Sequence, residues 1–260
     1  MDAAADAPTS EAFVQSLARG LAVIRAFDAD HPSLSLSDVA RRVDISRAAA
    51  GRFLRTLEAL GYVRGDGREF SLTPRVLELG FSYLSALSLP EVLQPHLEAL
   101  SRAVDESVSA AVLDGGDVVY IARVPTRRIM SVRITIGSRF PAHATSLGRV
   151  LLAGLPPSAR AAAIAQRPPT VITPRTVTDL VELDAELDAV RERGWALLDG
   201  ELEVGVRSIA APVHGRDGSV VAAINLSMAT TTGPLEPVLA ERVPMLLAAA
   251  AAIDAELRLV

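Results

Sequence analysis

The chain lacks two residue types altogether, cysteine and lysine. Without cysteine it can form no disulfide, no thiolate metal site and no cysteine nucleophile. Without lysine it has neither the phosphate-binding lysine of a P-loop, nor a Schiff-base amine, nor a Ser-x-x-Lys nucleophile pair. These two absences exclude several large classes of enzyme.

Long hydrophobic runs are also missing. The longest, around Leu246–Ile253, is rich in alanine and falls short of the roughly 20 apolar residues that span a bilayer. The opening stretch MDAAADAPTS is small and acidic, unlike the positively charged and then apolar start of a secretion signal. We therefore expect residues 1–10 to be a disordered tail of a cytoplasmic protein that has no membrane partner.

The charge balance limits the kind of nucleic-acid contact that is possible. All 26 basic residues are arginine, and 31 acidic residues bring the formal net charge to −5. A protein that coats nucleic acid would be basic over much of its surface, so any contact with DNA must be local. No group of His, Asp and Glu has metal-site spacing, and we expect neither a metal nor an organic cofactor.

A locally basic stretch extends from Leu34 to Arg68. Ser35 followed by Asp38 predicts the capped start of a short helix, and Ser46 is a natural N-cap for a second helix over residues 46–60. A glycine-rich turn at 65–67 predicts a β-hairpin wing. One stripe of the second helix is predicted to be buried: Ala50, Phe53, Leu54, Leu57 and Leu60.

The opposite face of the second helix consists of arginines and small residues. Arginine can bind guanine or phosphate, and alanine or glycine lets the backbone approach closely. Glycine costs about 1 kcal/mol in a helix relative to alanine, which favours a close-approach role for Gly51. The pattern predicts a recognition helix in the DNA major groove, with these candidate contacts: Arg41, Arg47, Ala48, Gly51, Arg52, Arg55 and Arg64.

The segments around this motif predict how the domain is assembled. Residues 11–28 predict a helix whose apolar stripe is wider than a small winged domain needs, so we predict that it also forms a dimer interface. Paired recognition helices would then read the two halves of a palindromic operator. Thr73 and Pro74 restart a helix. We therefore place a winged helix-turn-helix domain at 11–73 and a linker helix at 74–89.

From Ser107 onward the pattern becomes that of strands mixed with helices. Hairpins are predicted at 108–113 with 118–124 and at 206–214 with 219–227, and a short strand at 131–136. Helices are predicted at 91–104, from about 145, at 157–165, at 180–193 and at 235–259, the last interrupted by Pro244. This mixture predicts an α+β domain over residues 90–260 with an antiparallel sheet covered by helices.

Several of these segments together resemble the IclR-type transcriptional regulators. They are SLARGLAVIRAF at 16–27, LSDVARRVDISRAAAGRFLRTLEALGYV at 36–63, FSLTPRVLELG at 70–80, FPAHATSLGRVLLA at 140–153 and ELEVGVRSIAAPV at 201–213. The segments SRAAAGRFLRTL and YIARVPTRRIM look most like the Pca and Pob regulators of aromatic-acid catabolism in the β-ketoadipate pathway. The resemblance extends from about Phe13 to Leu257.

The resemblance implies a winged helix-turn-helix joined by a linker helix to a GAF-like α+β domain that binds a small organic acid. It also implies a homodimer, often a dimer of dimers. The ligand carboxylate would sit at the helix start matching Ser146 and Leu147, and a helix N-terminus is a ready anion site. Further pocket residues match Leu198, Ser208, Asn225 and Ser227.

Two more pocket candidates come from the arginine-rich stretch 123–139. Arg133 lies in the middle of the predicted strand and is our candidate partner for the ligand carboxylate. Met130 is a candidate apolar lining residue. The chain also departs from the family: Ala48 and Ala49 replace hydroxyl residues, and Asn225 replaces the serine of some members. Operator sequence and ligand identity therefore do not carry over.

We expect a DNA-binding regulator of catabolic genes, not an enzyme, that responds to an aromatic acid or a β-ketoadipate-type acid. The acid would act by favouring one placement of the paired winged domains. Two alternatives stay open from the residues. His143 and Ser146 could be the active pair of a small-molecule hydrolase, or the chain could be a ligand-binding module whose winged domain makes only protein contacts.

Overall fold

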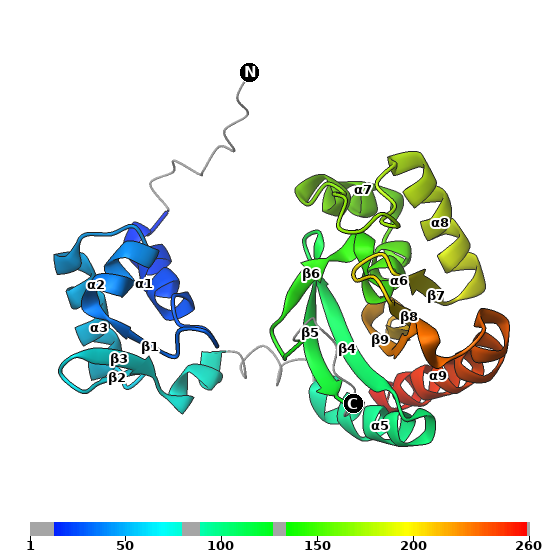
Figure 1. Cartoon of the computed structure of the whole chain (residues 1–260), viewed down its shortest axis with the longest axis horizontal. Helices are drawn as coiled ribbons and strands as arrows, with labels where there is room; N and C mark the ends of the chain where they lie inside the picture. Colours follow the sequence, from blue (N-terminus) through cyan, green and yellow to red (C-terminus); the bar gives the residue numbers. More distant parts are fainter. Residues whose placement is uncertain (1–12, 80–88, 127–133, 259–260) are drawn as a thin grey trace. The chain divides into compact units, whose positions relative to one another are not determined.

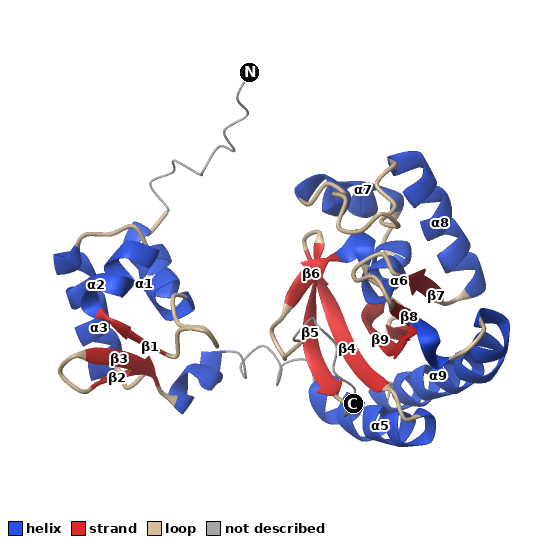
Figure 2. Cartoon of the chain, viewed as in Figure 1, coloured by secondary structure: helices blue, strands red, loops and turns tan. Residues whose placement is uncertain are grey.

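The computed structural model describes residues 13–79, 89–126 and 134–258. It divides the chain into two compact units, Met1–Ala86 and Leu87–Val260 (Figures 1 and 2). None of the helices in the described ranges is long and apolar enough to cross a membrane.

The first unit combines helices α1, α2 and α3 with a small antiparallel sheet whose strand order is β1-β3-β2. The β2–β3 hairpin is the predicted wing. Strand β1 was not predicted, because three residues are too few to show alternation. The elements are α1 (Gln15–Arg25), β1 (Ser33–Ser35), α2 (Leu36–Arg42), α3 (Arg47–Ala59), β2 (Val63–Gly65), β3 (Glu69–Leu72) and the 3-10 turn η1 (Pro74–Val76).

Both predicted helix starts in this unit are confirmed. Ser35 Oγ accepts a hydrogen bond from Asp38 N at 3.2 Å, and Ser46 Oγ accepts one from Ala49 N at 3.2 Å. Between α2 and α3 the chain reverses at Asp44, whose φ of 53° lies in the left-handed region that aspartate tolerates. Two side-chain caps and one left-handed residue therefore set the helix-turn-helix geometry.

The core of the first unit includes Val23, Val39, Ala50 and Leu54, all fully buried. Leu60, which we predicted to be buried, is 53% exposed. That prediction was wrong because Leu60 is the C-cap residue of α3, beyond the last turn that packs on the core.

The second unit is built on a six-stranded antiparallel sheet with the order β6-β5-β4-β9-β8-β7 (Figure 2). Helix α6 packs on β4, β7, β8 and β9, and α7 and α8 pack on α6. The strands are β4 (Ser107–Asp114), β5 (Asp117–Val124), β6 (Arg139–Pro141), β7 (Ala196–Asp199), β8 (Val206–His214) and β9 (Val220–Ala229). The helices around α6 are the 3-10 turn η2 (Ala142–Ala144), α6 (Ser146–Gly154), α7 (Pro157–Gln166) and α8 (Leu180–Arg193).

Helices α5 (Leu89–Val104) and α9 (Leu235–Leu257) pack against each other and against strands of the same sheet; a 3-10 turn, η3 (Thr230–Thr232), precedes α9. Successive side chains of a strand point to opposite faces. Ala223 belongs to the core under α6, so Ile224 points the other way, yet Ile224 is also fully buried. Both faces of the central strand β9 are therefore covered.

The structure corrects the predicted interruption of the last helix and part of the strand predicted at 131–136. Part of that strand and part of the predicted linker helix lie outside the described residues. Helix α9 is not interrupted by Pro244, which lies inside it; the loss of one backbone donor is tolerated in a helix that packs on α5 and β8. Of the strand predicted at 131–136, residues 134–136 are not a strand, and the rest lies outside the described residues. Residues 80–88 of the predicted linker helix also lie outside the described residues.

Candidate functional sites

The exposed face of α3 carries most of the predicted DNA contacts. Arg47, Ala48, Arg52 and Arg55 are all exposed. The three arginines form no ion pair or side-chain hydrogen bond with any described residue, so their guanidinium groups remain available to an external anion. Such groups bind phosphates and the acceptor edge of guanine.

The two outlying arginines of the set are exposed but engaged locally. Arg41 Nη2 lies 2.5 Å from Asp38 Oδ1. Arg64, on β2, donates from Nε to Ser71 Oγ at 3.1 Å. Exposed contacts of this kind stabilise little and can be exchanged for a phosphate.

Gly51 does not belong to the exposed face, so our placement of it there was wrong. It is buried, and a Cβ added to it would lie 3.6 Å from Leu36 Cδ1. Gly51 is three residues before the buried Leu54 and therefore lies at the edge of the buried stripe. Gly51 therefore faces Leu36 of α2, where a Cβ would make only ordinary van der Waals contact.

A pocket in the second unit lies between the start of α6 and the sheet. Its cavity volume is about 30 Å³. That is room for about two waters, so a benzoate-sized acid must push the walls apart. The pocket is lined by Tyr120, Ile134, Ala144, Thr145, Ser146, Leu198, Gly200, Glu201, Leu202, Glu203, Val206, Ser208, Asn225 and Ser227.

Five of the predicted effector residues meet in this pocket. The strand register places Leu198 beside Ser208 and Ser208 beside Ser227, in one row across β7, β8 and β9. Asn225 projects from the same face of β9 as Ser227, and Ser146 approaches from α6. The side chain of Leu147 is instead fully buried in the core, so only its backbone can serve a ligand. Met130 and Arg133 lie outside the described residues.

The start of α6 is shaped to leave backbone donors free. Thr145 is the N-cap, and its Oγ1 accepts from Gly148 N at 3.0 Å. The N–H groups before Gly148 have no partner within the helix. A Cβ on Gly148 would overlap the backbone of Ala142, so only glycine lets η2 lie this close to α6.

Arg149 ties one wall of the pocket to α8. It is fully buried, and it donates from Nε to His143 O at 2.6 Å. Its Nη1 lies 2.5 Å from Glu186 Oε2, and its Nη2 lies 2.8 Å from Glu201 Oε2. Our sequence analysis missed this network, although a single charge within the apolar helix SLGRVLLAG was a usable signal.

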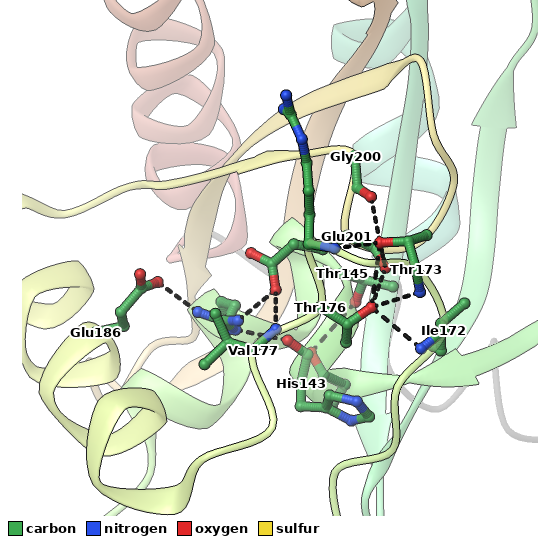
Figure 3. Close-up of polar contacts among 12 residues, drawn as sticks. His143, Thr145, Ile172, Thr173, Thr176, Val177, Glu186, Gly200 and Glu201 are labelled. Atoms are coloured by element: carbon green, nitrogen blue, oxygen red, sulfur yellow. Dashed lines mark hydrogen bonds and ion pairs between the residues drawn. The ribbon is translucent and has the colours of Figure 1, made fainter.

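The loop that carries Glu201 is held from its other side as well (Figure 3). Val177 N donates to Glu201 Oε2 at 3.1 Å. Thr173 Oγ1 donates to Gly200 O, and Thr176 Oγ1 donates to Glu201 O, both at 2.7 Å. Burial raises the pKa of Glu201, and the nearby Arg149 acts in the opposite direction.

Tyr120 forms part of the opposite, aromatic side of the pocket. It is 3% exposed and contacts Phe140 edge to face, with ring centroids 5.7 Å apart. Burial raises the pKa of its hydroxyl to about 12, so Tyr120 is neutral at physiological pH.

His143 and Ser146 do not form a catalytic pair. His143 Nε2 lies 3.2 Å from Thr170 O and 3.3 Å from Thr170 N. Within the described residues there is no hydrogen bond between His143 and the hydroxyl of Ser146. Burial lowers the pKa of His143, with Arg149 acting in the same direction. A nucleophilic serine needs a base within hydrogen-bond reach, itself oriented by a third group.

Comparison with known proteins covers both units. The family model described as the IclR helix-turn-helix domain matches residues 16–67, and the one described as the bacterial transcriptional regulator IclR C-terminal domain matches residues 81–255. The chain belongs to the IclR family. It is therefore a transcriptional regulator and not an enzyme, and the hydrolase alternative was wrong.

Individual relatives of this IclR-family regulator cover most of its length. The Pca regulon regulatory protein of Pseudomonas putida is 43% identical over 216 residues, which are 83% of this chain and 74% of that protein. A crystal structure of a transcriptional regulator from Rhodococcus sp. RHA1 is 55% identical, with a TM-score of 0.85 and coverage of 94% of this chain and 98% of that one.

A third relative is known with a ligand bound. It is an IclR homologue from Microbacterium hydrocarbonoxydans, complexed with 4-hydroxybenzoate. It is 29% identical, has a TM-score of 0.85, and the match covers 94% of this chain and 100% of that one.

Proposed function

We propose that this IclR-family regulator binds operator DNA through α3, binds a small carboxylic acid in the pocket at the start of α6, and controls genes of aromatic-acid catabolism. The observation that carries this proposal is the buried start of α6, where free backbone donors and Ser146 face one pocket. Two effector classes fit the proposal, an aromatic acid and a β-ketoadipate-type acid. The name of the Pseudomonas putida relative and the 4-hydroxybenzoate complex of the Microbacterium protein support the pathway.

The start of α6 supplies the attraction for the acid. Its unpaired N–H groups and the helix dipole give about half a positive charge at this point. The hydroxyl of Ser146, which is 1% exposed, adds one more donor. A carboxylate bound here would be held mainly by oriented dipoles in a site shielded from water.

The narrowness of the pocket gives the acid a way to act on the rest of the domain. To enter, the acid must displace walls that include the Glu201 loop, which Arg149 joins to α8. A ligand shifts an equilibrium between two conformations only through contacts that differ between them. We expect occupancy of the pocket to change DNA affinity through this displacement.

Helix α1 supports the proposed homodimer. Leu17 and Leu21 on this helix are 63% and 49% exposed, and Phe13, two residues before its start, is 54% exposed. Such a face on a short helix is typical of an interaction site, and a second copy of the chain would bring a second recognition helix for a palindromic operator. Analytical ultracentrifugation of the intact protein would measure its oligomeric state and would detect a dimer of dimers.

A DNA titration tests the proposal. Purified protein is titrated into labelled DNA from upstream of its own gene, and into unrelated DNA, at several salt concentrations. Replacing Arg52 by alanine should weaken specific binding by about 1–3 kcal/mol if it contacts a base. If Arg52 contacts a phosphate instead, the variant should lower the salt slope by about 1. Arg216→Ala, an exposed arginine in the β8–β9 turn, is the matched control and should bind like the parent protein.

Two outcomes would reject the proposal. The DNA-binding part fails if binding shows neither sequence preference nor salt dependence. The winged domain would make only protein contacts if a variant with Arg47, Arg52 and Arg55 all changed to alanine bound operator DNA as tightly as the parent.

A further inference from the structure

Helices α7 and α8 lie side by side on the second unit (Figure 1), where Arg160 of α7 pairs with Asp184 and Asp188 of α8. An open groove with a cavity volume of about 750 Å³ lies between them. None of its lining residues lines the pocket at the start of α6. The groove is lined by Pro157, Arg160, Ala161, Ile164, Ala165, Pro168, Pro169, Thr178, Leu180, Val181 and Asp184.

Much of the apolar lining of this groove is exposed to solvent. Helix α7 contributes Ala161 and Ala165, which are exposed and lie four positions apart on one face of the helix. Helix α8 contributes Leu180 and Val181, which are 59% and 79% exposed. Small residues let another backbone approach closely, and large apolar side chains gain most when a partner removes them from water. Exposed apolar surface rimmed by charge is typical of an interaction site, and a groove between two helices suits a third helix.

The edge of the groove formed by α8 is acidic. Arg160 is 6% exposed, with Nη2 3.0 Å from Asp184 Oδ1 and Nη1 2.8 Å from Asp188 Oδ1. The side chains of the two aspartates are 57% and 58% exposed. Because one guanidinium group cannot neutralise two carboxylates, this edge keeps a net negative charge. The stretch 178–190 as a whole contains five acidic residues and no basic one.

The arginines in the segment between α7 and α8 are already paired with other carboxylates. Arg167 Nε lies 2.9 Å from Asp117 Oδ1, and Arg175 Nη1 lies 3.0 Å from Asp199 Oδ1. Neither aspartate lines the groove. A molecule that covers the apolar lining would also remove water from the acidic edge, so it must bring positive charge of its own.

We infer that the groove between α7 and α8 docks an amphipathic helix of a partner protein. The apolar stripe of that helix covers Leu180 and Val181, and its arginine or lysine side chains lie along Asp184 and Asp188. Other occupants suit the charge less well. A second copy related by twofold symmetry would bring the same acidic edge to the contact, and nucleic acid or an anionic membrane would be repelled. Residues 1–12 of the chain itself carry three acidic side chains and no basic one.

The test measures the fluorescence anisotropy of two labelled peptides as the full-length protein is added. Each peptide has about 18 residues, which form about five helical turns. Both carry a stripe of leucine and alanine on one helical face, flanked by arginine in one peptide and by glutamate in the other. The parent protein should bind the arginine peptide about tenfold or more tightly than the glutamate peptide, and added salt should reduce this difference.

Substitutions locate the binding surface. Val181→Arg removes an apolar contact and adds a repelling charge, so it should weaken binding of the arginine peptide about tenfold or more. Val204→Arg is the matched control, because Val204 is 71% exposed, lies outside the groove and receives the same charge; it should bind the peptide like the parent. Ala161→Trp fills the groove without a change of charge and should also weaken binding. Both groove variants should keep the melting temperature of the parent, because both positions are exposed.

Three results would overturn the inference. The first is that neither peptide binds, or that both bind equally well. The second is that Val181→Arg binds the arginine peptide as tightly as Val204→Arg does. The third comes from analytical ultracentrifugation: if Val181→Arg, but not Val204→Arg, lowers the oligomeric state, a second copy of the chain covers the groove. None of these results bears on the proposed operator contact or effector pocket, which involve other residues.

Discussion

Replacing Arg149 by methionine should destabilise the second unit strongly. The substitution keeps most of the apolar stem and removes a fully buried guanidinium group. Glu201 is 8% exposed. Of the described partners of its carboxylate, only the N–H of Val177 would remain. Breaking a buried ion pair in this way costs about 3–5 kcal/mol. Glu186 adds little to this, because its side chain is 43% exposed.

The effect should depend on pH in a defined direction. Burial raises the pKa of Glu201, and Arg149 opposes that rise. Without Arg149 the folded-state pKa rises further above the unfolded value. A carboxyl group with a raised folded pKa contributes stability at low pH and loses it as the pH rises through that pKa. The deficit of Arg149→Met relative to the parent should therefore shrink as the pH is lowered from about 7 toward 5.

Urea unfolding followed by tryptophan fluorescence measures the loss of stability in the second unit. Trp195 is the one tryptophan of the chain and precedes β7, so its signal reports the second unit. Adding Glu201→Gln to Arg149→Met should recover part of the loss and remove its pH dependence, with Glu201→Gln alone as the control. A loss below about 1 kcal/mol, or one that Glu201→Gln does not relieve, would refute the argument.

Three further substitutions test local features by thermal unfolding. Gly148→Ala should cost about 1–3 kcal/mol, because the new methyl group overlaps the backbone of Ala142, which cannot rotate away; an unchanged melting temperature would show that η2 moves freely. Ser46→Ala should cost about 1 kcal/mol in the first unit through loss of the cap on Ala49 N, and no change in circular dichroism melting would contradict this. Asp179→Ala, which removes the cap of two N–H groups at the start of α8, should cost about 0.5–2 kcal/mol; a parent-like transition of the second unit would count against it.

The elements that could be predicted from the sequence depend on short-range chemistry. Ser46 caps α3 as expected, because a cap needs only the next three residues. Helix α8 has the predicted bounds, and it ends at Gly194, whose φ of 79° is the left-handed conformation that glycine adopts easily. The hairpins β4–β5 and β8–β9 likewise follow from their turns.

The features that were missed depend on contacts between distant segments. Whether Gly51 faces DNA or α2 is decided by Leu36, which is fifteen positions earlier in the chain. The partners of Arg149 come from two other elements, and no local pattern identifies them. The meeting of Ser208, Asn225 and Ser146 in one pocket follows from strand register and helix packing, and only the family resemblance predicted it.

The two ends of the proposed effector pocket differ in how readily substitutions can change them. At the start of α6 the backbone of Ala142 leaves no room for a side chain on Gly148, so position 148 cannot accept a larger residue without moving η2. Asn225 and Ser208 instead project from strands whose backbone ladders do not depend on the side chain. Under the proposed function, a lineage of such regulators can acquire a new effector through single substitutions in β8 or β9 while the acid group stays at the same helix start.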